Sequence, residues 1–187
     1  MVQTPVRTLT LEEFLQQSET KPASEYIDGQ ILQKPMPKVE HSVIQGDLST
    51  AINALLKVDK VGRALPELRC TFDGRSIVPD ITVLPWAVIP REENGKVAGE
   101  LFAAPDWMIE ILSPGQSQTK LVKKIMHALA HGTQMGWLID PAEECVLAYT
   151  PDSRTMLYEA PDAQLPVPAF ATTFQLTVGE LVAWLYE

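Results

Sequence analysis

Two acidic residues lie inside stretches of sequence that have the composition of buried strands: Asp80 within residues 77–84 and Glu110 within residues 107–112. Because side chains alternate between the two faces of a strand, each acid should share its face with apolar side chains. An unpaired buried charge costs on the order of several kcal/mol, so chains tolerate one mainly for an ion pair, a metal or catalysis. Two such acids on neighbouring strands could bind one divalent cation.

A lysine in the helical stretch that follows, residues 118–132, could join these acids. Successive helix residues are separated by about 100°, and the apolar stripe predicted here consists of Leu121, Ile125, Ala128 and Leu129. Lys124 lies on the flank of that stripe, so its side chain can bend toward the sheet. Lys123 points nearly the opposite way and should be solvated. If the helix carries a functional lysine, we expect it to be Lys124.

The elements predicted around these residues favour an α/β sheet with helices on its faces. Asp28 and Gly29 predict a hairpin over residues 25–32, while Thr10 and Glu13 have the spacing of a capping box. Helices are expected at residues 11–17, 39–58, 118–131 and 177–186. Strands are expected at residues 63–72, 77–84, 107–112 and 135–140, with an exposed loop at 86–104 and a further hairpin at 144–150 and 154–159. Two tryptophans, Trp107 and Trp137, should fill the core.

Size and charge limit the classes of protein that fit. With 187 residues and 45% hydrophobic content, the chain suits a single domain over residues 1–187. Lysine and arginine number 15 against 24 aspartate and glutamate, which gives a formal charge of −9. This charge argues against a general nucleic-acid coat protein, but a local basic groove on an acidic body stays compatible with it.

The cysteines and the apolar segments indicate a soluble cytoplasmic protein with no membrane partner. Cys70 and Cys145 lie far apart and form no CxxC pair, and no histidine spacing indicates a zinc site, so we expect reduced structural thiols. The first residues lack the apolar run of a signal peptide, and no segment has the roughly 18 apolar residues that a membrane span needs.

The order of the motifs resembles one known family. These motifs are Glu25-Tyr26-Ile27-Asp28-Gly29, His41, Pro79-Asp80, the run from Pro105 to Pro114 around Glu110, a helix with Lys124 and Gly132, and Gly136-Trp137-Leu138-Ile139-Asp140-Pro141. Together they are similar to the Uma family of restriction endonuclease-like proteins, in the PD-(D/E)XK nuclease superfamily, over residues 25–149. The resemblance implies a restriction endonuclease-like mixed sheet flanked by helices, with an N-terminal β-hairpin and an extra C-terminal hairpin and helix.

The same resemblance implies a role for each matched residue. Asp80 and Glu110 would bind a divalent metal, Mg²⁺ or Mn²⁺, because carboxylate oxygens suit hard cations. Lys124 would orient the attacking water or offset charge on the transition state. His41 would lie near the active site as a phosphate contact or proton shuttle, and Glu25 would add a metal ligand or hold Lys124. The reaction implied is hydrolysis of nucleic-acid phosphodiesters, with DNA as the expected substrate.

The sequence departs from the superfamily pattern in the region on which the mechanism depends. Leu112 stands two residues after Glu110, where the superfamily places a lysine, and the resemblance implies that Lys124 replaces that lysine. Lys120 and Ala128 stand where family members often carry an acid and a tyrosine. Glu40 and Glu67 are weaker candidates for the tasks assigned to Glu25.

Less specific explanations exist for every one of these residues. Asp80 could be a strand-end acid bonded to backbone N–H groups, and Glu110 could pair with Arg63 or Arg69. Lys124 could extend along the helix flank into solvent, His41 could be a hydrogen-bonded helix-start residue, and Glu25 an exposed hairpin residue.

Three classes of function follow from these alternatives. The first is a metal-dependent nuclease, the second a catalytically inactive nuclease fold that acts as an interaction or structural module, and the third a hydrolase of other phosphodiesters. For the nuclease, cleaving both strands of a duplex with one site per chain would be easiest for a homodimer.

Overall fold

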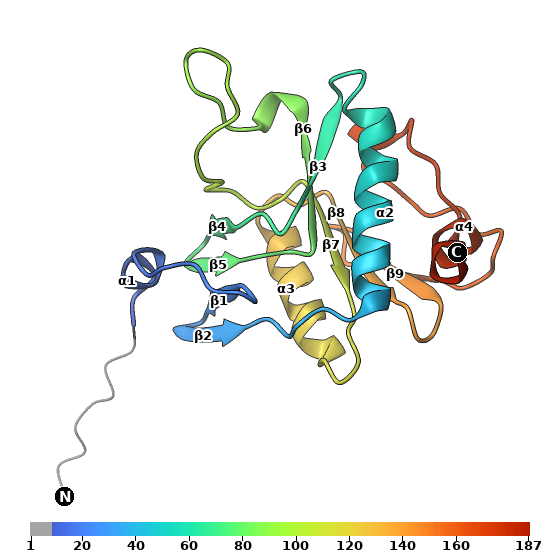
Figure 1. Cartoon of the computed structure of the whole chain (residues 1–187), viewed down its shortest axis with the longest axis horizontal. Helices are drawn as coiled ribbons and strands as arrows, with labels where there is room; N and C mark the ends of the chain where they lie inside the picture. The colour runs from blue at the N-terminus through green and yellow to red at the C-terminus, as the bar shows by residue number, and fades with distance from the viewer. Residues whose placement is uncertain (1–8) are drawn as a thin grey trace, which may run out of the picture.

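A mixed six-stranded sheet forms the centre of the computed structural model, which describes residues 9–187 (Figure 1). The first eight residues of the domain predicted for residues 1–187 lie outside the described part. The strand order is β10-β9-β8-β7-β6-β3, and only β7 and β8 run parallel. Its strands are β3 (Gly62–Pro66), β6 (Ile81–Pro85), β7 (Trp107–Ile111), β8 (Met135–Asp140), β9 (Cys145–Tyr149) and β10 (Thr155–Tyr158).

A smaller antiparallel sheet, in the order β2-β1-β5-β4, lies beside the first. Its strands are β1 (Ser24–Ile27), β2 (Gln30–Gln33), β4 (Cys70–Phe72) and β5 (Arg75–Ile77). Two Asp-Gly turns close its hairpins: Asp28 with Gly29, and Asp73 with Gly74. All four residues have positive φ, which suits a tight hairpin turn. The hairpin predicted over residues 25–32 is therefore confirmed.

Helices cover both faces of the large sheet. On one face, α2 (Val39–Leu56) packs with the C-terminal segment over Trp107, Trp137 and their neighbours. On the other face, α3 (Gln118–Ala130) packs over Met108 and Leu138. Figure 1 shows α2 and α3 on opposite sides of the strands. This is the predicted mixed α/β sheet flanked by helices, with the N-terminal hairpin and the extra C-terminal hairpin and helix.

The remaining helices are short, and two of them begin with capping boxes, of which the first is the predicted one. Thr10 and Glu13 cap α1, and Thr177 and Glu180 cap α4. The C-terminal helix becomes a 3-10 turn before residue 186, and the predicted loop at 86–104 begins with another such turn. These elements are α1 (Leu11–Leu15), α4 (Val178–Ala183), η1 (Trp86–Val88), η2 (Ala169–Ala171) and η3 (Trp184–Tyr186).

The strands predicted at residues 63–72 and 77–84 are each divided in the structure. Both predicted strands change sheets: β3 and β6 belong to the large sheet, whereas β4 and β5 belong to the small one. Residues 78–80 form the crossing between β5 and β6 and are not in a strand. Pro79 lies at its centre, where its missing N–H costs no ladder hydrogen bond. Asp80 is therefore a residue of the crossing, not of a strand interior.

Glycine allows α3 to lie close to the sheet. A Cβ atom added at Gly136 of β8 would overlap the side chain of Ile125 in α3. A larger residue at this position would push the helix outward, together with Lys124. The close approach is thus part of what brings a helical lysine to the strand acids.

The buried tryptophans and the thiols follow expectation. Trp107 and Trp137 are fully buried and meet edge to face, with ring centroids 4.8 Å apart. Cys70 and Cys145 are free thiols, and burial raises the pKa of Cys70 to about 12. Along residues 9–187, none of the helices combines the length and apolar character needed to cross a membrane.

Candidate active site

Asp80 lies at the point where the two sheets meet, and its side chain is almost fully buried. Its Oδ2 accepts a hydrogen bond of 2.8 Å from the backbone N–H of Ile111 in β7. The same oxygen lies 3.2 Å from His41 Nε2, which comes from the first turn of α2. The crossing therefore places the Asp80 carboxylate at the end of β7, beside the residue that follows Glu110.

A lysine that we did not predict holds the other oxygen of Asp80. Lys34 follows β2, and its Nζ lies 2.6 Å from Asp80 Oδ1 and 2.9 Å from the carbonyl oxygen of Val78. Its side chain is only 9% exposed. A lysine so deeply enclosed has lost most of its hydration, so the ion pair with Asp80 is its main compensation.

Glu110 projects from β7 toward α3, on the strand face that it shares with Met108. Lys124 Nζ lies 2.8 Å from Glu110 Oε1 as an ion pair. However, neither carboxylate oxygen of Glu110 receives an aligned hydrogen bond from any residue in the described part of the chain. Buried carboxylates are normally well supplied with hydrogen bonds, so these oxygens have capacity for a further ligand.

Glu25 of β1 fastens Lys124 to the small sheet. Its Oε1 accepts a hydrogen bond of 2.6 Å from Lys124 Nζ and one of 2.8 Å from the backbone N–H of Val78. Glu25 and Lys34 thus satisfy the N–H and the C=O of Val78 in the crossing. The hairpin β1–β2 contributes both residues, so it links the crossing to α3.

Burial and neighbouring charges shift the pKa values of Asp80 and Glu110 in opposite directions. Burial by itself would raise the pKa of Asp80, but the hydrogen bond from His41 and the charge of Lys34 hold that pKa well below its usual range. Burial raises the pKa of Glu110 to about 7, because the charge of Lys124 offsets only part of the desolvation. Burial opposes the ammonium form of Lys124, yet Glu110 and Glu25 outweigh it and raise the Lys124 pKa.

A small cleft gives solvent access to Asp80 and its neighbours. Its lining residues come from the segment after β2, the start of α2, the turn after β3 and the loop after β7: Lys34, Pro35, Pro37, His41, Glu67, Asp80, Ser113 and Gln116. Gln116 Oε1 accepts a hydrogen bond of 3.1 Å from the Ser113 backbone N–H, which orders the loop at the rim.

The structure brings all five predicted site residues into one connected group. Asp80 with His41 forms one half, and Glu25, Glu110 and Lys124 form the other; the Ile111 N–H and the Val78 crossing join the halves. Their roles in a reaction stay predictions. The weaker candidates separate: Glu67 lines the cleft, whereas Glu40 is exposed and does not line it.

The structure decides two expectations, one about the partner of Glu110 and one about the two lysines of α3. Arg63 and Arg69 were the expected alternative partners of Glu110; Arg69 instead pairs with Glu19 at 2.7 Å, and Glu110 pairs with Lys124. Lys123 is exposed while Lys124 is buried, as the helical face analysis predicted. Sequence reasoning missed Lys34, because a lysine next to Pro35 in a connecting segment carries no periodic signal.

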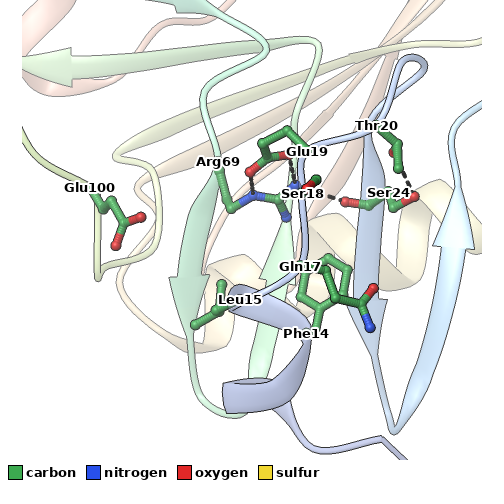
Figure 2. Close-up of a pocket in the computed structure, with 9 residues that line it drawn as sticks. All are labelled: Phe14, Leu15, Gln17, Ser18, Glu19, Thr20, Ser24, Arg69 and Glu100. Atoms are coloured by element: carbon green, nitrogen blue, oxygen red, sulfur yellow. Dashed lines mark hydrogen bonds and ion pairs between the residues drawn. The ribbon is translucent and has the colours of Figure 1, made fainter.

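A second hollow, beside α1, has a structural explanation (Figure 2). There the Arg69 guanidinium binds Glu19 and the carbonyl of Ser24, and it lies 5.1 Å from the centre of the Phe14 ring. Figure 2 shows Arg69, which lies just before β4, reaching across to this segment. The Arg69 cation is already paired, and this pairing helps to hold α1 in place. The described residues that line the hollow include no group of buried acids like the one around Asp80.

The donor set around Asp80 and Glu110 fits a hard divalent cation. Both offer carboxylate oxygens, the ligands that Mg²⁺ and Mn²⁺ prefer, and both oxygens of Glu110 lack hydrogen bonds within the described residues. Apart from His41, the group contains three carboxylates (Glu25, Asp80, Glu110) and two ammonium groups (Lys34, Lys124), a sum of −1. A divalent cation would reverse that sign and make the site attractive to phosphate.

Comparisons with known proteins identify the family of the chain and a solved structure with the same fold. The family model Uma2, described as "Putative restriction endonuclease", matches residues 11–179. A solved structure described as a "putative nuclease belonging to DUF820 from Anabaena variabilis ATCC 29413" is 55% identical, with a TM-score of 0.93. The match covers 95% of this chain and 99% of that one. A comparison with curated proteins found no match.

Proposed function

Because the chain belongs to the Uma2 family of restriction endonuclease-like proteins, we propose that it hydrolyses nucleic-acid phosphodiesters with the help of a divalent metal. DNA is the proposed substrate, and Mg²⁺ or Mn²⁺ the proposed metal. The observation that carries this proposal is the Glu110 carboxylate, which is fully buried, pairs with Lys124 and lies in the electrostatic field of Asp80, while neither of its oxygens receives an aligned hydrogen bond within residues 9–187. Asp80 and Glu110 would hold the metal.

Once bound, the metal would polarise the scissile phosphate and favour ionisation of an attacking water. The protein itself would hold charged side chains in fixed positions around the reacting phosphate. Asp80 is kept ionised by Lys34 and His41, and it is oriented by the N–H of Ile111. A carboxylate that is already charged and oriented needs little reorganisation to bind a cation.

Lys124 provides a fixed positive charge at the reacting centre. Glu25 and Glu110 hold its ammonium group from two sides, at 2.6 and 2.8 Å. We propose that Lys124 orients the attacking water or stabilises negative charge on the transition state, the task that a strand lysine performs in the superfamily pattern. Glu25 is proposed as a positioning residue, because it touches Lys124 and the backbone of the crossing.

Lys34 and His41 are proposed to act on the substrate side of the site. Both line the cleft, and both contact the Asp80 carboxylate. When Asp80 serves as a metal ligand, Lys34 would no longer be needed to balance its charge, and its ammonium group could pair with a phosphate oxygen. Lys34 is thus proposed to bind Asp80 in the metal-free protein and phosphate in the complex.

Replacing Lys34 by Met is expected to change metal affinity and activity in opposite directions. The variant removes a cation that competes for Asp80, so Mn²⁺ should bind about tenfold or more tightly. Cleavage at saturating metal should nevertheless fall by about 10²-fold, because a charge at the phosphate is lost. Calorimetry and plasmid nicking measure the two effects, with Lys38→Met as the control at an exposed position in the same segment. Weaker metal binding in the Lys34 variant would contradict this role.

A plasmid assay tests the proposed function itself. Supercoiled DNA should be nicked in the presence of Mg²⁺ or Mn²⁺ and left intact when EDTA is present. A single-stranded RNA of matched length separates DNA from RNA activity. If metal, DNA and RNA concentrations are varied over a wide range without cleavage, the nuclease proposal fails.

One observation favours a different function. Lys34 and Lys124 already neutralise the acids in the metal-free protein, and such a closed network also suits a catalytically inactive module that keeps the fold for an interaction. That candidate predicts no metal binding at Asp80 and Glu110. The homodimer and the cytoplasmic location stay predictions, and solution size measurements that show only monomers would count against the dimer.

A further inference from the structure

A second group of potential metal ligands lies where the end of α3 meets the β4–β5 turn. It consists of Asp73, in the turn between β4 and β5, and of His127 and His131, at the end of α3. One ligand atom from each residue lies within 4.8 Å of the others. The two histidines are one helical turn apart, so their rings project from the same side of the helix.

We propose that Asp73, His127 and His131 form a binding site for Zn²⁺. In tetrahedral zinc sites, ligand atoms about 2.0–2.1 Å from the metal lie roughly 3.4 Å from one another. Here Asp73 Oδ2 lies 3.0 Å from His131 Nε2 and 3.9 Å from His127 Nε2. The two distances bracket the spacing that zinc requires, so small side-chain movements would complete the site.

The hydrogen bond at Nδ1 leaves the other ring nitrogen of His131, Nε2, facing Asp73. Its Nδ1 lies 2.7 Å from the carbonyl oxygen of His127, and since a carbonyl only accepts, Nδ1 must carry the proton. In the neutral ring, Nε2 then presents a lone pair toward Asp73 Oδ2, which is also an acceptor. Two acceptors 3.0 Å apart need a cation between them, either a second proton on His131 or a metal ion.

His127 supplies a second observation that points to a ligand. Its Nε2 is buried and has no hydrogen-bond partner among the described residues. The ring stacks on Phe72 of β4 with centroids 5.2 Å apart, which fixes its orientation toward Asp73. A buried ring nitrogen without a partner is costly, and coordination of a metal would remove that cost.

Two opposite charges of the small-sheet hairpins, Arg75 and Asp28, lie near this position. The nearby Arg75 is paired with Asp28 at 2.8 Å, so its charge is partly neutralised. The C-terminal end of α3, where His131 lies, carries the negative end of the helix dipole and favours a positive ion. Mixed imidazole and carboxylate ligands select Zn²⁺ over Mg²⁺, so this site and the Asp80 site would take different metals.

Zinc at this site would connect the small sheet to α3. Asp73 belongs to the β4–β5 turn of the sheet that carries Glu25, while α3 carries Lys124. The ion would therefore stabilise the packing that holds the Glu25–Lys124 pair. We did not predict this site from the sequence, because Asp73 is distant from the histidines along the chain and only the fold supplies the third ligand.

Zinc titration of the full-length chain tests the proposal, in a background of Asp80→Asn and Glu110→Gln that removes the acids of the active site. We expect one Zn²⁺ per chain by calorimetry and, at a hundredfold excess over Kd, a rise in Tm of roughly 5–10 °C. Mg²⁺ at the same concentration should leave Tm unchanged. Because the background is inactive by design, the result does not depend on nuclease activity.

Ligand variants in that background decide the location of the site. Asp73→Asn keeps the positive φ that asparagine tolerates, and His131→Gln alters a partly exposed ring, so both should fold. Each should weaken zinc binding at least tenfold, whereas Asp59→Asn, at an exposed turn, should leave it unchanged. Absence of zinc binding in the background protein would overturn the proposal, and so would binding that both ligand variants retain.

Discussion

Replacing Lys124 by Met is expected to lower the free energy of unfolding by about 3–5 kcal/mol at pH 8, because it leaves Glu25 and Glu110 buried without their shared cation. Removing one partner of a buried ion pair costs far more than the net contribution of the pair, since the remaining charges stay desolvated. Nuclease activity should also disappear. Thermal or urea unfolding of the metal-free protein measures the first effect and plasmid nicking the second.

The chain offers a matched control and a rescue for this variant. Lys123→Met makes the same chemical change one residue earlier on α3, where the side chain is exposed, and should change stability by less than about 0.5 kcal/mol. Adding Glu25→Gln to Lys124→Met removes one buried carboxylate that has lost its cation. The double variant should recover part of the lost stability without recovering activity. A Lys124→Met protein as stable as the wild type would contradict the ion pairs described here.

Replacing Glu110 by Gln is expected to abolish metal-dependent cleavage and to stabilise the metal-free protein at pH 8. Burial raises the pKa of Glu110 in the folded state from 4.5 to about 7, so the folded protein holds this proton more tightly than the unfolded chain does. The wild type therefore loses stability as the pH rises from about 4.5 through 7. The amide cannot ionise, and Lys124 keeps its ion pair with Glu25, so the variant should gain about 1–3 kcal/mol relative to the wild type above pH 7.

Unfolding at pH 5 and pH 8, with and without Mn²⁺, measures this change. Without metal, the advantage of Glu110→Gln over the wild type should be larger at pH 8 than at pH 5. With excess Mn²⁺ the order should reverse, because only the wild type is stabilised by binding. If Mn²⁺ stabilises both proteins equally, Glu110 is not a ligand.

Local sequence signals predicted the elements that carry most of the site. The Asp-Gly pair specified the hairpin that holds Glu25, because these residues adopt the positive φ of its turn. The apolar stripe of α3 specified that Lys124 faces the sheet and Lys123 faces solvent. Strand alternation placed Glu110 on the face of Met108, toward α3. In each case a short-range rule determined the direction of one side chain.

The relations between sheets could not be predicted in this way. Residues 77–84 read as one strand because their composition is apolar throughout, yet the chain crosses between sheets at residues 78–80. What stabilises that crossing is tertiary: Glu25 and Lys34 satisfy the N–H and C=O of Val78. The partnership of Lys34 with Asp80 depends on the same crossing, so no local pattern could reveal it.

Calorimetric titration of Mn²⁺ into the wild type and into Asp80→Asn tests whether Asp80 and Glu110 hold a divalent metal that cleavage needs. The amide oxygen can still accept the hydrogen bond from Ile111, so the fold should survive, and plasmid nicking is measured on the same samples. Asp152→Asn, at an exposed turn, is the control. We expect Mn²⁺ binding and nicking in the wild type and the control, and loss of both in Asp80→Asn. A wild type that binds no Mn²⁺, or an Asp80→Asn protein that binds and nicks as the wild type does, would contradict that expectation.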